Sequence, residues 1–162
     1  MSPAKRPFLD KTHPETYKAL AGVTRHVRRA ERAAGLSRAL TELVNVRVSQ
    51  LNGCPACLSV HVPAARRAGV SELKLDLLPS WQDAEVYTEE ERIALELAEA
   101  LTIGRRTTGT ISGPELVDVQ NRALRTLGEE KFTALEWAII TINAFNRVSI
   151  ASGHPPHEAN YS

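Results

Sequence analysis

Residues 42–61 read ELVNVRVSQLNGCPACLSVH, a stretch that predicts two helices joined by a sharp turn. The apolar side chains before Asn52 cover more than one face of a helix expected over residues 38–51, so this helix should be buried or lie at an interface. Gly53 breaks it, because glycine can adopt a positive φ and turn the chain. A second, central helix is expected over residues 54–68, with a proline in its first turn.

Both cysteines of the chain lie at the start of this second helix. Cys54, Cys57 and His61 stand at i, i+3 and i+7, so their side chains project from one helix face. Cys57 and His61 are an i, i+4 pair, which lets the imidazole take the thiol proton or stabilise the thiolate, the nucleophilic form of cysteine. Cys54 is close enough to close a disulfide on an oxidised Cys57.

A carboxylate lies twelve residues before the first cysteine. If the two helices are antiparallel, Glu42 lies about 16 Å and His61 about 13 Å from the turn at roughly 1.5 Å per residue, within about one helical turn of each other. A carboxylate beside the histidine would orient the ring and stabilise its protonated form. The alternative is a solvated glutamate in the first turn of its helix, and the spacing does not decide between them.

Two arguments conflict over which cysteine attacks a substrate. The position nearest the helix end favours Cys54, as in thioredoxin-type sites, whereas the pairing with His61 favours Cys57. We assign Cys57 as the attacking and Cys54 as the resolving residue, because the i, i+4 base is a specific interaction and the helix end serves both thiols.

The rest of the chain also has helical periodicity, and no alternating stretch bounded by turns stands out. The sequence therefore predicts an all-α fold of about six to seven helices. It forms one domain over residues 1–162, with tails at 1–11 and 153–162. The further helices are expected from Thr12 to before Gly35, over 71–78, from Thr88 to about Ile103, from Ser112 to Gly128 and over about 130–151, with a polar loop over 104–111.

Helix starts are indicated by capping residues. Ser37 should cap the helix over 38–51, and three sequences have the Ser/Thr-x-x-Glu pattern of a capping box. These are Thr12 with Glu15, Thr88 with Glu91, and Ser112 with Glu115.

Proline residues interrupt two parts of the pattern. Pro63 lies inside the helix that carries the cysteines, where it should free the carbonyl of Ser59 and kink the helix. His154 and His157 flank two prolines near the end of the chain, and we expect them to be tail histidines without a role.

The composition excludes several classes of protein. A content of 43% hydrophobic and 24% charged residues indicates a globular chain, and a formal net charge of +1 gives no attraction to nucleic acid or anionic membranes. Residues 1–13 lack the apolar segment of a secretory signal, and no apolar run approaches the roughly 20 residues of a membrane helix. The expected compartment is the cytoplasm.

In a reducing compartment a close cysteine pair is more often catalytic, redox-sensing or metal-binding than structural. A zinc site would need Cys54, Cys57, His61 and a fourth ligand from Glu42 or a tail histidine, and two inert core thiols are a further alternative. A c-type haem site is excluded because Leu58 follows the second cysteine. We predict no metal and no cofactor.

The central stretch resembles the alkylhydroperoxidase D (AhpD)-like branch of the carboxymuconolactone decarboxylase family over about residues 14–156. The specific part is the spacing of Glu42, Cys54, Cys57 and His61. Supporting matches are RVSQLNG at 47–53, AARRAG at 64–69, TEEERIAL at 88–95 and INAFNR at 142–147.

This resemblance implies an all-helical fold, assembly as a homo-oligomer and a peroxidase site. In the family the second cysteine is taken to meet the peroxide and the first to resolve it, which here are Cys57 and Cys54, while Glu42 and His61 relay protons. Ala56 departs from the family, because AhpD proper has a histidine there and many relatives a tyrosine. The lactone decarboxylases of the wider family lack the cysteine pair, so decarboxylation is the weaker interpretation.

We therefore predict a cytoplasmic enzyme, a thiol-dependent peroxidase with a hydroperoxide as substrate and an external dithiol as reductant. The alternative from another class is a non-enzymatic redox sensor or helical interaction module, in which the disulfide shifts assembly and does not turn over.

Overall fold

The computed structural model describes residues 6–104 and 109–161, and within them the chain is helical and contains no β-strand. The predicted all-α class is confirmed, with one short α-helix and two 3-10 helices in addition to the seven expected helices. The α-helices are α1 (Leu9–Thr12), α2 (Pro14–Ala33), α3 (Arg38–Asn52), α4 (Pro55–Arg67), α5 (Glu72–Leu77), α6 (Glu89–Thr102), α7 (Pro114–Leu127) and α8 (Glu129–Ser152), and the 3-10 helices are η1 (Leu78–Asp83) and η2 (Glu158–Asn160).

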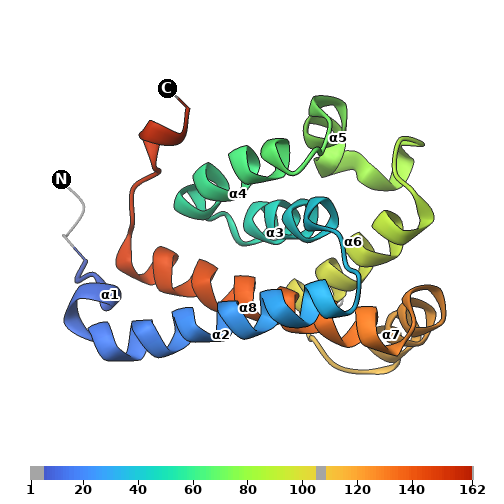
Figure 1. Ribbon diagram of the computed structural model, residues 1–162, viewed down its shortest axis with the longest axis horizontal. Helices are drawn as coiled ribbons and strands as arrows, with labels where there is room; N and C mark the ends of the chain where they lie inside the picture. The colour runs from blue at the N-terminus through green and yellow to red at the C-terminus, as the bar shows by residue number, and fades with distance from the viewer. Residues whose placement is uncertain (1–5, 105–108, 162) are drawn as a thin grey trace.

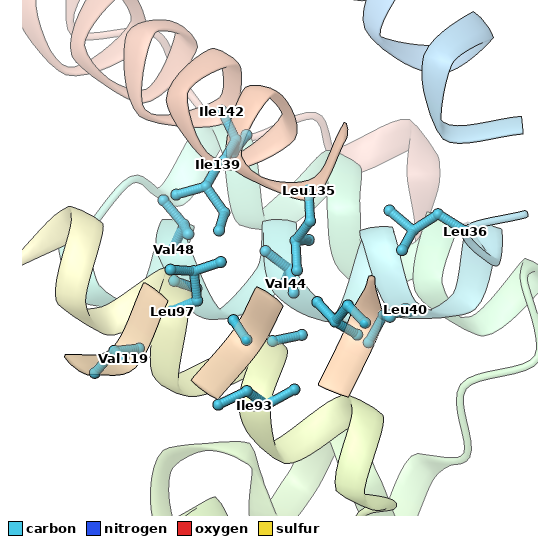
Figure 2. Packing of buried hydrophobic residues seen from close by; sticks show 14 residues of the cluster. Leu36, Leu40, Val44, Val48, Ile93, Leu97, Val119, Leu135, Ile139 and Ile142 are labelled. Carbon is cyan, nitrogen blue, oxygen red and sulfur yellow. The ribbon is translucent and has the colours of Figure 1, made fainter. Parts of the chain in front are cut away.

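Helix α3 lies at the centre of the molecule, between α4 on one side and α6 and α8 on the other (Figure 1). Its apolar residues are buried on several faces, as the sequence predicted. Figure 2 shows how Val44 and Val48 of α3 meet Leu97 of α6 and Leu135 and Ile139 of α8 in the main core. Burial of such side chains is the main force that holds the helices together.

A second group of buried side chains holds α4 against the opposite face of α3. Leu43 and Val46 of α3 pack with Leu78 and Trp81 of η1 and with Leu95 of α6. Ala65 of α4 belongs to the same cluster. Helix α3 is thereby fixed on both faces, so residues of α3 and α4 can form a rigid site.

Two of the predicted helix starts are confirmed in detail. The Ser37 hydroxyl accepts the backbone N–H of Leu40 at 3.1 Å. Thr88 and Glu91 form the reciprocal capping box that begins α6.

The other two predicted capping boxes are wrong. The N-cap of α2 is His13, whose side chain makes no capping hydrogen bond, and that of α7 is Gly113, which has no side chain. Thr12 instead ends α1, and its hydroxyl donates to the carbonyl of Phe8 one turn back, at 3.2 Å. Part of the loop expected over 104–111, residues 105–108, lies outside the described residues.

The chain ends differ from the expected tails, because both pack against the helical core. Helix α1 begins within the segment expected as the first tail, where Arg6 donates to the carbonyl of Ile150 at 2.7 Å and the Leu9 N–H donates to the Ser152 hydroxyl at 3.0 Å. Residues 153–160 leave α8 and run beside α4, so the two chain ends lie on the same side of the molecule (Figure 1). No helix in the part of the chain that the structure describes is long and apolar enough to span a membrane.

Candidate active site

The turn between α3 and α4 brings the candidate residues together. Gly53 adopts the left-handed conformation, with φ 63° and ψ 43°, as the sequence predicted. The N–H groups of Gly53 and Cys54 donate to the carbonyls of Gln50 and Ser49, at 3.1 and 3.0 Å, which ends α3 with satisfied hydrogen bonds. The chain then reverses, and α4 runs back beside α3 (Figure 1).

The two cysteines occupy the first turn of α4. Cys54 is the N-cap residue, and its sulfur accepts the N–H of Cys57 at 3.3 Å. The two sulfurs form a disulfide across a Cα–Cα distance of 5.4 Å. Because this distance is ordinary for a disulfide, the pair can close without moving the backbone.

Glu42 and His61 are in direct contact. Glu42 Oε2 lies 2.7 Å from His61 Nδ1, and the carboxylate has no exposed surface. Arg38 donates to the other carboxylate oxygen, and Asn45 donates to Oε2 at 3.5 Å. The alternative of a solvated glutamate is therefore wrong.

The surroundings of Glu42 keep it ionised although it is buried. Burial raises the pKa of this carboxyl, but the hydrogen bond and charge of His61, together with Arg38 and Asn45, outweigh burial and lower the pKa below the ordinary value of 4.5. An ionised carboxylate accepts hydrogen bonds only, so Nδ1 of His61 carries a proton toward Glu42. His61 Nε2 is then the ring nitrogen left to accept a proton.

A cavity of about 470 Å³ lies over Cys57. Both Cys57 and His61 line it, whereas Cys54 does not. Cys54 is 1% exposed and Cys57 is 7% exposed. A small molecule that enters this cavity therefore meets Cys57 first.

His61 also lines a second cavity of about 330 Å³ between α2, α3 and α8. Arg38 and the buried Glu31 line this cavity too. His61 therefore lies between the two cavities, and hydrogen bonds link it through Glu42 to Arg38 in the second one.

Several residues around the cysteines were not expected from the sequence. Arg38 could have been found, because it lies at i, i+4 from Glu42. No sequence pattern near Asp10, His154 or His157 indicated a place in the site, yet all three line the cavity over Cys57. The positions of His154 and His157 do not support the expectation that they have no role.

Ser59 forms the attachment point for the end of the chain. Its carbonyl, predicted to be freed by Pro63, accepts the side-chain amide of Asn160 at 3.0 Å, and its hydroxyl accepts the N–H of His157 at 2.8 Å. No three histidine, cysteine, aspartate or glutamate side chains within residues 6–104 and 109–161 cluster so as to hold a metal ion.

Comparison with known proteins places this site in a family. Residues 14–100 match the sequence profile of the carboxymuconolactone decarboxylase family. The chain belongs to this family. The match covers α2 through most of α6, and so includes all four candidate residues.

Two bacterial relatives of this family member are uncharacterised proteins. YdfG of Bacillus subtilis (strain 168) is 32% identical over 142 residues, which cover 87% of this chain and 89% of YdfG. YnjA of Escherichia coli (strain K12) is 33% identical over 69 residues, 42% of this chain and 37% of YnjA.

A solved structure supports the AhpD-like assignment within the family. The Agrobacterium tumefaciens protein ATU0492 is described as a protein of unknown function, with antioxidant defence protein AhpD as its suggested identity. It superposes with a TM-score of 0.78 at 27% identity over 94% of this chain and 98% of its own. The AhpD-like fold predicted from the sequence is confirmed.

Proposed function

We propose that this protein is a thiol-dependent peroxidase that reduces hydrogen peroxide or organic hydroperoxides through Cys57 and Cys54. The proposal rests on how the side chains of the site are arranged. Cys57, paired with a second cysteine at disulfide distance, lines an open cavity beside an imidazole that a buried carboxylate orients. Membership of the carboxymuconolactone decarboxylase family and the AhpD-like fold are consistent with this activity.

The first step activates and oxidises Cys57. His61 Nε2 takes the thiol proton, and the ionised Glu42 stabilises the imidazolium that forms. The thiolate attacks the nearer peroxide oxygen, the O–O bond breaks, and its electron pair leaves on the farther oxygen. The products are a sulfenic acid on Cys57 and, once the leaving oxygen gains a proton, water or an alcohol.

The second step joins the two sulfurs. The Cys54 sulfur attacks the sulfenic sulfur of Cys57 and releases water, which gives the disulfide that the structure contains. An external dithiol then reduces it.

The geometry also favours one direction of reduction. Cys57 is the sulfur that lines the cavity, so the dithiol attacks it and Cys54 leaves as a thiolate. The N–H of Cys57 donates to that sulfur at the N-cap, which stabilises the leaving thiolate.

The decisive experiment measures turnover with a hydroperoxide and several dithiol donors. Reduced wild-type protein should lose about two mass units as its thiols form one disulfide, and a competent donor should sustain steady-state consumption of peroxide. Cys54→Ser should stop at a sulfenic acid on Cys57, and Cys57→Ser should lose rapid oxidation.

Three outcomes of these experiments would overturn or change the proposal. If the wild type forms no disulfide with peroxide, the proposal is wrong. If oxidation occurs once and no donor supports turnover, the disulfide acts as a sensor. A sulfenic acid on Cys54 in a rapidly reacting Cys57→Ser variant would reverse the roles of the two cysteines.

A further inference from the structure

A second imidazole–carboxylate pair lines the cavity over Cys57. His154 Nε2 lies 2.9 Å from Asp10 Oδ1, and both side chains are mostly buried. The two residues are 144 positions apart and come from opposite ends of the chain. Both line the same cavity as Cys57 and His61.

Several contacts hold His154 in position. The Phe8 ring meets the His154 ring edge to face, with 4.7 Å between centroids. The backbone of His154 continues from the end of α8, where its N–H donates to the Ser149 carbonyl at 3.1 Å. Farther along, the His157 N–H binds the Ser59 hydroxyl at 2.8 Å, so the segment is attached on both sides of His154.

The two nitrogens of the His154 ring have different partners. Nε2 faces the carboxylate of Asp10, which is a strong hydrogen bond. Nδ1 lies 3.5 Å from the hydroxyl of Ser149, which is the limit of a hydrogen bond. Ser149 and His154 both line the cavity, and the contact at Nδ1 is weak, so an oxygen atom of a bound peroxide could replace the Ser149 hydroxyl there.

Reduction of an alkyl hydroperoxide needs a proton donor. The leaving alkoxide is a strong base, and general acid catalysis of such a step contributes about 10²- to 10⁴-fold. Ala56, between the two cysteines, has no proton to give. The other titratable side chains that line the cavity are Lys11, which pairs with Asp10 at 3.4 Å, and Tyr17, His61 and His157.

We propose that His154, oriented by Asp10, donates a proton from Nδ1 to the alkoxide oxygen that is released when Cys57 attacks an alkyl hydroperoxide. This inference rests on the proposed peroxidase function. The thiolate and ROOH become the sulfenic acid and ROH, the proton comes from the His154 imidazolium, and the neutral ring regains a proton from solvent. His61 receives the thiol proton and His154 supplies the product proton, so each histidine transfers one proton.

Asp10 is suited to this role because it stays ionised. Burial raises the pKa of its carboxyl, but hydrogen bonds from His154 and Lys11 outweigh burial and lower the pKa below the ordinary 3.8. An ionised carboxylate accepts hydrogen bonds only, so the Nε2 proton points toward Asp10, and Nδ1 is the ring nitrogen left for a bound peroxide.

The test uses two peroxides of similar size with different leaving groups. Ethyl hydroperoxide releases an alkoxide that needs a proton, whereas peracetic acid releases a weakly basic carboxylate that does not. Rate constants for oxidation of reduced Cys57 are measured with both in wild type, His154→Gln and Asp10→Asn. The matched control is His26→Gln, on the exposed surface of α2 away from the cavity.

We expect His154→Gln to react about 10²-fold more slowly with ethyl hydroperoxide, with little change toward peracetic acid. Asp10→Asn should show the same selectivity with a smaller loss, and His26→Gln should match the wild type. Asp10→Asn leaves the His154 ring in place, so it tests the pair even if His154→Gln does not fold.

Three outcomes would overturn the inference. Equal losses with both peroxides would show that His154 only shapes the cavity. No loss with ethyl hydroperoxide would show that His61 returns the thiol proton to the leaving oxygen. A wild type that reacts with neither peroxide would overturn the proposed function itself, and the inference with it.

Discussion

Two buried glutamates near the site have opposite electrostatic environments. Glu42 has three polar partners, Arg38, Asn45 and His61, and its pKa is lowered although burial alone would raise it. Glu31, on α2, is also buried, and burial raises its pKa more than the charge of Arg38 lowers it. Glu31 also has neighbours that lower its pKa, but they do not outweigh its burial, whereas the direct contact with His61 does so at Glu42. A carboxylate out of water is stable only when hydrogen bonds and opposite charges replace the water.

The first prediction concerns Glu42→Gln. Because the folded pKa of Glu42 lies below 4.5, its contribution to the free energy of unfolding is present above that pH and is lost as the pH falls through the folded value. At pH 7 the variant should therefore lose about 3 kcal/mol, the usual result of breaking a buried ion pair. Below pH 4 the difference from wild type should shrink.

Urea unfolding from pH 3 to pH 8 measures this difference. The control is Glu72→Gln, whose partner Arg66 is exposed and whose loss should change stability by less than about 1 kcal/mol. An unchanged free energy of unfolding at pH 7 in Glu42→Gln would contradict the role of the buried carboxylate.

The second prediction concerns Glu31→Gln, which should change the free energy of unfolding at pH 7 in the opposite direction. With a raised folded pKa, the native state favours the protonated form, so the stability that Glu31 contributes is present below pH 4.5 and is lost as the pH rises through the folded value. Removing the charge should make the protein more stable at pH 7 and leave it unchanged at pH 3. The same unfolding series measures it, and destabilisation at pH 7 would refute it.

At the scale of elements, the proline inside α4 explains how the end of the chain reaches the site. Pro63 has no N–H, so the carbonyl of Ser59 has no helical partner from it. The side chain of Asn160, in η2, donates to this carbonyl instead. The carbonyl left without a helical hydrogen bond thus binds the segment that forms one side of the cavity over Cys57.

The third prediction uses two substitutions that act on this contact from opposite sides. Asn160→Ala removes the donor, and Pro63→Ala adds a backbone N–H that competes for the Ser59 carbonyl. Both should lower the protection of residues 154–161 from hydrogen exchange by about 1 kcal/mol, the net value of one hydrogen bond, while the core keeps its protection.

The matched control for this pair is Glu158→Ala, in the same 3-10 helix with an exposed side chain. It should leave the exchange of the segment unchanged. Equal protection in Asn160→Ala and wild type would show that the contact to Ser59 does not hold the segment.

At the scale of the whole molecule, two large apolar side chains lie near each other on the surface of α8. Trp137 is 56% exposed and Ile140 is 51% exposed, one turn apart on α8. Side chains of this size rarely stay in water next to each other on a helix that is otherwise part of the core. We propose that this face of α8 contacts a second copy of the chain.

The fourth prediction follows from that face. Trp137→Glu should shift the protein to a smaller assembly in sedimentation velocity, because a buried charge at an interface is unfavourable. Val117→Glu, at a 53% exposed position on α7, is the control and should leave the assembly as in wild type. If wild type sediments as a single chain, the proposed contact is wrong.

Much of the candidate site could be predicted because helices impose regular spacing. Cys57 and His61 lie one turn apart on α4, and the turn at Gly53 puts Glu42 within one turn of His61 once the two helices pack side by side. The all-α class, the buried α3 and the freed carbonyl of Ser59 follow from periodicity and from the missing N–H of Pro63. The Thr12 and Ser112 capping boxes failed because a short motif does not say which of two adjacent residues begins the helix.

The sequence by itself thus determined most of the helices, the turn, and the place of Cys54, Cys57 and His61 on one helix face, because these depend on residues that are near one another along the chain. The structure decided that Glu42 is buried against His61. Only the tertiary structure decided that both chain ends fold over Cys57, and that Asp10 meets His154 across 144 residues. That contact depends on how α1, α4 and α8 pack, and no local spacing encodes the packing of segments so far apart.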